Sequence, residues 1–310
     1  MKNNKQNLVS VVIPAFNEEE SILRTVPRVV SCLKYVNEYE IIIVDDGSTD
    51  KTLSNVLKLK KKYKHVRVIR MQGNHGHMLA LEAGLSASRG EYVFSIDADL
   101  QEPPEAIVKM LQIIQQNTDL DYVQAVRASR DNDSPLKRSS AGLYYYLIRK
   151  LTGIAVIPQA ADFRVIRRAP LDKILKLPEK QKVFRLLLPK LGMRYQTVEV
   201  IRTERMHDSS KYNFQMMSKL ALNSFFGFSA RPLRLIAVIA GGMAVLFSFL
   251  AVATFAIWVN YKTVPGWTSI ALLVLLSQTV VIFCISIIAE YVSRIFTQIL
   301  DRPSFESKEI

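Results

Sequence analysis

The sequence predicts an α/β domain followed by a two-helix transmembrane hairpin. Over residues 1–166, short β-rich runs alternate with helical patterns, which is typical of βαβ units in an open sheet. Residues 235–259 and residues 268–289 contain no Asp, Glu, Lys or Arg. A helix rises about 1.5 Å per residue, so each segment is long enough to cross the roughly 30 Å hydrocarbon core of a bilayer. A purely soluble protein is therefore not expected.

The predicted strands are almost continuously apolar, as in IIIV at 41–44 and YVFSI at 92–96. This pattern indicates a parallel sheet covered on both faces. Ligands of such sheets bind beyond the carboxyl ends of the strands. Strands are predicted at 8–13, 40–44, 66–69, 92–96 and 122–126, and helices at 19–34, 49–62, 76–88 and 104–116.

The composition excludes some classes of protein. Charged residues are 22% of the 310, too few for a disordered polyelectrolyte, and the net charge is +13. The densest basic run, 58–67, has the pattern of a solvated helix face, and no nucleic-acid motif accompanies it. Attraction to anionic lipid explains the charge more simply, so no nucleic-acid partner is expected.

The chain is expected to keep both ends in the cytosol. It has two cysteines and no disulfide framework, and its first residues lack the apolar stretch of a signal peptide. Residues 205–232 mix basic residues with Phe, Met and Leu, which predicts an amphipathic helix on the membrane surface. Positive residues favour the cytoplasm, and in this sequence they stand before the first span and after the second. These residues are Arg231, Arg234, Arg294 and Arg302.

The clearest chemical motif is SIDADLQ at 95–101, directly after a predicted strand. Asp97 and Asp99 flank one residue and can present oxygens to a hard cation, and Mg²⁺ usually keeps substrate phosphates in its shell. The alternative is a loop that caps the helix opening at Pro103 and Pro104. The position after a buried strand favours a metal.

A second motif, VDDGSTD at 44–50, also follows an apolar strand. Ser48 or Thr49 could cap the next helix. That role does not explain the adjacent Asp45 and Asp46, whose repulsion requires a donor or a cation. A nucleoside hydroxyl or amide would serve.

Two further segments have weaker chemical meaning. In PAFNE at 14–18, Phe16 could lie against a base and Glu18 could accept hydrogen bonds, although a plain strand-to-helix turn is the simpler interpretation. His75 and His77 form an H-x-H pair that could bind zinc, but no Cys or further His stands near them in sequence. A loop packed near a nucleotide is the favoured interpretation of that pair.

Taken together, PAFNE, VDDGSTD and DADLQEPPE resemble glycosyltransferase family 2, which has the GT-A fold. NHGH at 74–77, AGL at 83–85 and ADFR at 161–164 resemble the polyisoprenyl-phosphate glycosyltransferases of that family, with Ala161 in place of a glycine. SSKY at 209–212 resembles their G-x-SKY segment, with the glycine missing. The bactoprenol glucosyltransferases are similar over nearly the whole chain, and the dolichyl-phosphate mannose synthases over the catalytic domain.

The resemblance implies roles for particular residues. The nucleotide-sugar would be held by Pro14, Phe16, Glu18, Asp45, Asp46, Asp97 and Ala98. Mg²⁺ (or Mn²⁺) would be bound by Asp97, Asp99 and Gln101. The phosphates and the acceptor would be held by Arg127, Arg130, Lys137, Arg138, Arg164 and Lys211. The catalytic group would comprise Asp162, Asp99, Arg164 and Lys211, with Asp162 acting as a base or only as a positioning group.

The resemblance also implies a domain order. Residues 1–204 would form the cytosolic GT-A catalytic domain, 205–232 a juxtamembrane amphipathic segment, 233–294 the transmembrane hairpin and 295–310 a cytosolic tail. The protein would then be a multi-pass protein of the cell membrane with its catalytic domain on the cytoplasmic side.

The implied reaction is an inverting, Mg²⁺-dependent transfer of one sugar from a nucleotide-sugar to polyprenyl (undecaprenyl) phosphate. UDP-glucose is the first choice of donor, and UDP-GlcNAc and GDP-mannose are the alternatives. Membrane lipids are further partners, and a homo-oligomer is left open. A processive polysaccharide synthase is disfavoured because a Q-x-x-R-W motif is missing, and a catalytically inactive membrane scaffold because the acidic motif is intact.

Overall fold

The computed structural model describes residues 8–128, 157–179, 182–201 and 307–310, with isolated positions between 242 and 295. The chain divides into two compact units. The first comprises Met1–Tyr146, Ile154–Ser210 and Arg302–Ile310, and the second comprises Leu147–Gly153 and Lys211–Asp301.

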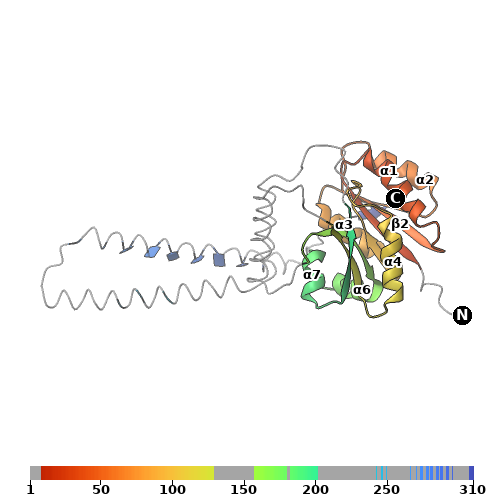
Figure 1. Ribbon diagram of the computed structural model, residues 1–310. Helices are drawn as coiled ribbons and strands as arrows, with labels where there is room; N and C mark the ends of the chain where they lie inside the picture. Colours follow the sequence, from red (N-terminus) through yellow and green to blue (C-terminus); the bar gives the residue numbers. More distant parts are fainter. Residues whose placement is uncertain are drawn as a thin grey trace. The chain divides into compact units, whose positions relative to one another are not determined.

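A mixed sheet forms the centre of the first unit (Figure 1). It has eight strands in the order β7-β5-β6-β4-β1-β2-β3-β8. Its strands are β1 (Val9–Ala15), β2 (Tyr39–Asp45), β3 (Val66–Met71), β4 (Tyr92–Ser95), β5 (Tyr122–Arg127), β6 (Ala160–Arg167), β7 (Tyr195–Val200) and β8 (Ser307–Glu309). β1 pairs in parallel with β2 and β4, β2 with β3, and β5 with β7. β6 is antiparallel to both β4 and β5, and β8 is antiparallel to β3.

Helices cover both faces of the sheet. They are α1 (Ser21–Cys32), α2 (Thr52–Lys62), α3 (His77–Ala87), α4 (Ala106–Gln116), α6 (Arg168–Leu175) and α7 (Phe184–Lys190). Apolar residues of α1, α2 and α4 belong to one buried cluster with alternate residues of β1 and β2, such as Val11 and Ile41. α3 packs on the opposite face, where Gly84 comes so close that an added Cβ would lie 2.3 Å from Val12 and 2.8 Å from Val44.

The strands and helices expected within residues 8–128 are confirmed, but the expectation of a wholly parallel sheet is wrong. β6 enters the sheet antiparallel, and its alternation includes Asp162 and the fully buried Arg164, so it lacks the continuous apolar run that marks the other inner strands. The start of α2 also differs from expectation. Asp50 Oδ1 accepts the N–H of Thr52 at 2.9 Å, so Asp50, and not Ser48 or Thr49, satisfies the first turn.

The end of the chain belongs to the sheet. β8 lies beside the β3 edge, with Glu309 opposite Ile69. The Arg67 guanidinium donates two hydrogen bonds of 2.8 Å to the Glu309 carboxylate and also contacts Glu40. The N–H of Ile310 donates to the Val68 carbonyl at 3.0 Å. The tail expected at 295–310 is therefore a structural strand over its last residues.

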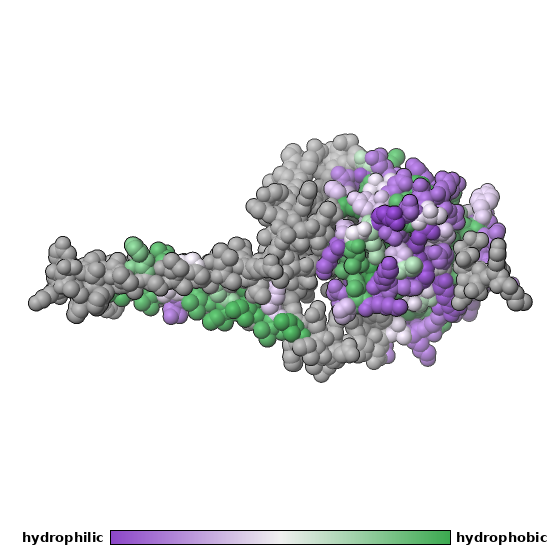
Figure 2. Space-filling model, turned by 90° about the horizontal axis from the view of Figure 1, so that it is seen from below, coloured by the Kyte–Doolittle hydropathy of each residue, from purple (hydrophilic) through white to green (hydrophobic). Residues whose placement is uncertain are grey.

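The predicted amphipathic segment, 205–232, lies outside the described residues, and so does most of the predicted hairpin, 233–294. No helix in the part of the chain that is described is both long and apolar enough to cross a membrane. The isolated described positions from 270 to 295 are helical, and many of them carry exposed large apolar side chains. Figure 2 shows these residues largely in green, whereas the visible face of the sheet unit is mostly purple.

Candidate functional site

The candidate site lies where β6 runs beside the carboxyl end of β4. Ser95 in β4 stands opposite Arg164 in the antiparallel register. The same register continued by two residues brings Asp162 opposite Asp97, which follows β4 directly. Ser95 Oγ donates to the Asp162 carbonyl at 2.9 Å and fixes the two segments together. Two acids far apart in the chain thus meet at one edge of the sheet.

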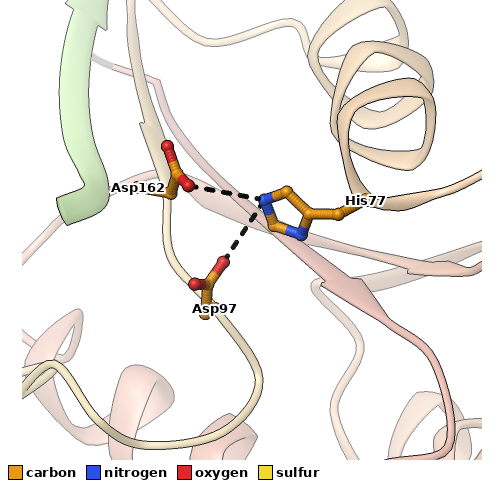
Figure 3. A group of neighbouring side chains, drawn as sticks. All are labelled: His77, Asp97 and Asp162. Carbon is orange, nitrogen blue, oxygen red and sulfur yellow. Dashed lines mark ion pairs between the residues drawn. The ribbon is translucent and has the colours of Figure 1, made fainter. Parts of the chain in front are cut away.

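His77 is the third member of this group. It is the first residue of α3, and Figure 3 shows its ring directed at Asp97 and Asp162. Its Nε2 atom lies 3.6 Å from Asp97 Oδ1 and 3.9 Å from Asp162 Oδ2. The three side chains offer ligand atoms within 4.8 Å of one another. A histidine and two carboxylates at this spacing could hold a metal ion.

A second group of acids shares Asp97 with the first. The carboxylates of Asp97, Asp99 and Glu102 lie within 4.8 Å of one another, and Glu102 is 3% exposed. Three carboxylates at this distance repel one another unless a cation or hydrogen bonds compensate for their charge. Oxygen ligands of this kind suit Mg²⁺ or Mn²⁺. The acids expected to bind metal, Asp97 and Asp99, are therefore adjacent, and Glu102 joins them.

Gln101, the other expected metal ligand, is 1% exposed. Its backbone N–H donates to Asp99 Oδ1 at 3.1 Å, which shapes the loop around the acids. Leu100, between them, has a φ of 59°, a left-handed conformation that few non-glycine residues adopt. Ala98 is buried, and its carbonyl accepts a 2.7 Å hydrogen bond from Thr25 Oγ1. The metal role of Gln101 and the nucleotide role of Ala98 stay predictions.

Asp162 is surrounded by cations. Arg164 Nη2 contacts one of its oxygens, and Arg185 Nη2 lies 3.3 Å from the other. Burial alone would raise the pKa of Asp162, but Arg185 and Arg164 outweigh burial and hold the pKa below its usual range. Asp162 is thus ionised at neutral pH and is a weak base. The arrangement favours the positioning role among the two considered for it.

Arg164 itself is 1% exposed, and its described contacts are with Asp162 and the Ala161 carbonyl. Burial lowers the pKa of this guanidinium, and the Asp162 carboxylate opposes that shift. Arg127, at the end of β5, lies 3.8 Å from Glu102 and so faces the acidic cluster. The remaining expected cationic residues lie outside the described residues; they are Arg130, Lys137, Arg138 and Lys211.

Burial raises the pKa of Asp97; His77 opposes this shift, whereas Asp162 and Asp99 add to it. A nearby positive charge would therefore stabilise the ionised form of Asp97, and a bound cation would supply that charge.

Asp46 is buried, and hydrogen bonds to its carboxylate compensate for the loss of water. Its two oxygens accept the backbone N–H groups of His75 at 2.8 Å and Gly76 at 2.9 Å. Burial still raises the pKa of Asp46 above its usual value, although those two hydrogen bonds lower it. Asp45 is also buried, and its Oδ1 accepts the N–H of Ser48 at 3.3 Å. Both acids therefore shape loops at the edge where the site lies, and their nucleotide role stays a prediction.

The PAFNE segment is tied to the DGSTD segment. Asn17 Oδ1 accepts the N–H of Thr49 at 2.9 Å, and the N–H of Glu18 donates to Thr52 Oγ1 at 2.8 Å. Pro14 is buried inside β1 opposite Val44, and Phe16 and Glu18 are half-buried just beyond it. These residues line the same edge as Asp45 and Asp46. Their contact with a nucleotide stays a prediction.

The sequence did not identify His77, Glu102 or Arg185 as site residues. The H-x-H pair drew attention to His77, but its acidic partners are 20 and 85 positions away in the chain. Glu102 had the plain signal of a third acid within five residues of Asp97. Arg185 precedes a leucine run in α7 and has no local signal at all.

The fold occurs in solved enzymes. Glucosyl-3-phosphoglycerate synthase from Mycobacterium tuberculosis, in a crystal structure with Mn²⁺, UDP and phosphoglyceric acid, superposes with a TM-score of 0.53. The match covers 71% of this chain and 76% of that one at 19% identity. At that identity the likeness concerns the fold, which is GT-A-like.

Two relatives match over nearly their whole length. The bactoprenol glucosyl transferase of Shigella phage SfX is 33% identical over 306 residues, covering 96% of this chain and 97% of the relative. The undecaprenyl-phosphate 4-deoxy-4-formamido-L-arabinose transferase of Proteus mirabilis (strain HI4320) is 29% identical over 97% of this chain and 93% of its own. The model of the family described as glycosyl transferase family 2 matches residues 10–175, more than half of the chain. With its acidic edge, its GT-A-like sheet and these matches, the chain belongs to glycosyl transferase family 2 and is a glycosyltransferase.

Proposed function

We propose that this protein transfers one sugar from a nucleotide-sugar to a polyprenyl phosphate, giving a lipid-linked sugar for modification of a cell-surface glycan. The observation that carries the proposal is the reach of the similarity. The family model ends at residue 175, yet the bactoprenol glucosyl transferase matches 96% of the chain, including the apolar segments near its end. An acceptor with a lipid tail gives those segments a purpose.

The acidic cluster supports donor binding through a cation. Asp97, Asp99 and Glu102 would hold Mg²⁺ or Mn²⁺, with Gln101 in the same loop. A divalent cation there would neutralise the donor diphosphate as the nucleotide leaves. Arg127, beside Glu102, adds a positive charge at the same edge.

Asp162 would position the acceptor or stabilise the sugar carbon as it becomes positive. A phosphate monoester has a second pKa of about 6, so the acceptor is already largely dianionic at pH 7 and needs little help from a base. The lowered pKa of Asp162 agrees with that role. Direct attack of the phosphate on the anomeric carbon would invert its configuration.

The donor we favour is UDP-glucose, because a bactoprenol glucosyl transferase is among the similar proteins. UDP-GlcNAc and GDP-mannose are the alternatives. The undecaprenyl chain is the acceptor that both named relatives suggest, since bactoprenol and undecaprenyl phosphate occur in their names.

We also propose that residues 233–294 form a membrane hairpin with both ends on the cytoplasmic side. Two segments without acidic or basic residues support it, as do the exposed apolar side chains between 270 and 295. β8 adds a topological argument. Because Ser307–Glu309 and β3 belong to one sheet, any crossing of a bilayer between residues 202 and 306 must be matched by a crossing back.

The direct test supplies membranes that contain the protein with labelled UDP-glucose, UDP-GlcNAc and GDP-mannose in turn. Undecaprenyl phosphate and Mg²⁺ are added, and the lipid is extracted. We expect label in the lipid from one donor and none after chelation of the metal. Absence of lipid-linked label from every donor, in membranes where the protein is folded, would favour the inactive scaffold.

Two reporter fusions and one substitution test the membrane part. A reporter fused after Ile310 should be cytosolic and one inserted near Pro265 external; an external C-terminus would contradict the hairpin. Lys211→Ala should lose transfer while the protein stays in the membrane, because two long spans outweigh a single surface charge worth about 1 kcal/mol. Unchanged transfer at saturating acceptor would make Lys211 a surface anchor only.

A further inference from the structure

His77 Nε2 has no hydrogen-bond partner among the described residues, although it is directed at two carboxylates (Figure 3). Its distances of 3.6 Å to Asp97 and 3.9 Å to Asp162 exceed the roughly 2.7–3.2 Å of a hydrogen bond. A polar atom that is shielded from water and lacks a partner requires an explanation. In this case the atom is also a common metal ligand.

The backbone that carries the ring is held in place by the loop before it. Asp46 accepts the N–H groups of His75 and Gly76, and Gly76 turns the chain into α3 with a φ of 94°. The Gly76 carbonyl then accepts the N–H groups of Leu79 and Ala80. The backbone of His77 is therefore placed by a buried carboxylate and a helix start.

The gap distinguishes a direct ion pair from a shared cation. A protonated imidazole paired with a carboxylate would close to about 2.8 Å, since charge-assisted hydrogen bonds are short. Neighbouring ligand atoms that share a cation at about 2.0–2.2 Å stay roughly 2.8–3.6 Å apart, closer around an octahedral ion than around a tetrahedral one. The 3.6 Å separation from Asp97 is at the upper end of that range and is longer than a direct ion pair. The side chains of His77 and Asp97 are 37% and 32% exposed, so both lie near the surface of the unit, although His77 Nε2 itself is covered.

Asp162 is the less suitable of the two acids. One of its oxygens contacts Arg164, and the other lies 3.3 Å from Arg185. A cation bound to it would meet two guanidinium groups. Asp97 instead belongs to both groups, with His77 in the first and with Asp99 and Glu102 in the second, so it is the residue through which His77 and an ion of the acidic cluster can meet.

We propose that His77 Nε2 is a nitrogen ligand of the divalent cation that the acidic cluster binds, together with Asp97. The inference rests on the cation of the proposed function and adds a residue and a selectivity to it. Mn²⁺ also favours oxygen ligands, but as a transition metal it accepts an imidazole nitrogen more readily than Mg²⁺, which prefers oxygen alone. The protein should therefore bind Mn²⁺ more tightly than Mg²⁺, and His77 should account for the difference.

The test uses the purified full-length protein in detergent with Mn²⁺ alone. Titration followed by electron paramagnetic resonance gives the Mn²⁺ dissociation constant, and competition gives that of Mg²⁺. Pulsed resonance detects nitrogen bound to Mn²⁺. The variant is His77→Gln, and the matched control is His75→Gln, an exposed histidine two residues away. Incorporation of ¹⁵N-histidine into the unchanged protein tests the same point without any variant.

We expect nitrogen coupling in the wild type and in His75→Gln, with the ¹⁵N pattern after isotope exchange. His77→Gln should lose the coupling and bind Mn²⁺ about tenfold more weakly or worse, with a smaller change for Mg²⁺. Bound Mn²⁺ without histidine nitrogen coupling in the wild type would overturn the role of His77 and leave the cation of the proposed function intact. Failure of the wild type to bind Mn²⁺ at all, with or without UDP, would instead remove the cation itself.

Discussion

Asp46 directly follows β2, and its carboxylate accepts the N–H of Gly76 at 2.9 Å. Gly76 is the residue directly before His77. One acid of the VDDGSTD segment thereby sets the start of α3. His77 then faces Asp97 from the next strand but one in the sheet order. Three motifs that are separate in the sequence are thus linked, by a side-chain-to-backbone hydrogen bond and by the approach of two side chains.

Removing this acid should loosen the loop. In Asp46→Ala the N–H groups of His75 and Gly76 lose buried, charged acceptors, which costs about 1–3 kcal/mol of folding free energy. We expect a lower thermal midpoint and weaker Mn²⁺ binding, because His77 loses its fixed position. Asp119→Ala is the control, since Asp119 is 86% exposed and its contact with Arg194 is a surface pair. Equal midpoints for the two variants would show that Asp46 does not hold the loop.

The acidic cluster gives a sharper prediction for turnover. Asp99→Asn keeps the shape of the side chain but removes a charge that the cation requires. Transfer should fall about a hundredfold or more, corresponding to about 3 kcal/mol of lost transition-state stabilisation. Near-native activity of Asp99→Asn in saturating Mg²⁺ would rule out this residue as a ligand.

Glu105→Gln is the matched control in the same segment. Glu105 is 58% exposed and forms an ion pair of 2.9 Å with Arg28 on the surface, far less costly to lose. Its transfer rate should stay close to that of the wild type. A large loss in both variants would point to general damage of the loop and not to a metal site.

Much of the fold was accessible from the sequence because the inner parallel strands are apolar runs with helices between them. β6 was not predicted for a physical reason: it pairs the buried Arg164 with the partly exposed Asp162, so its pattern resembles neither a covered strand nor a helix. β8 escaped because its three exposed residues are held by a single edge, through pairing and the Arg67 contact, and not by burial.

The site was predictable only in part. The DxD acids follow an inner strand, so their place at the carboxyl edge follows from the topology of parallel strands. His77 and Arg185 could not be placed without the register between β4 and β6 and the path of the loops, since both meet Asp162 through long-range contacts. Of the cationic residues expected near the phosphates, only Arg127 and Arg164 are among the described residues. Those at 130–138 and 211 lie outside them.

The packing of α3 can be tested at Gly84. A Cβ there would lie 2.3 Å from Val12 and 2.8 Å from Val44, and both are stiff, buried side chains of the sheet. Gly84→Ala should destabilise the protein by about 1–3 kcal/mol, although alanine favours a helix by up to about 1 kcal/mol. The thermal midpoint should fall, and Mn²⁺ binding should weaken because α3 carries His77.

Gly73→Ala is the control for that substitution. No atom lies within 4 Å of a Cβ added at Gly73, so Gly73→Ala should change the free energy of unfolding by no more than about 0.5 kcal/mol. If Gly84→Ala were as stable as Gly73→Ala, the close approach of α3 to β1 would be wrong.

The last prediction concerns β8 and pH. The hydrogen bonds from Arg67 lower the pKa of Glu309 below its usual value of 4.5, although partial burial opposes them. A lowered folded-state pKa means that the pair stabilises the strand fully above about pH 4.5 and loses this effect as the pH falls through the folded pKa. Because Glu309 is 47% exposed, the contribution should stay below about 1 kcal/mol.

In Glu309→Gln the protection of the Ile310 N–H, which donates to Val68, should fall by up to about fivefold at pH 7. Hydrogen exchange corrected for intrinsic rates should show this difference shrinking toward pH 4, while Glu38→Gln, at an exposed glutamate before β2, behaves like the wild type throughout. A difference between wild type and Glu309→Gln that is constant from pH 7 to pH 4 would mean that the Arg67 contact does not hold the strand.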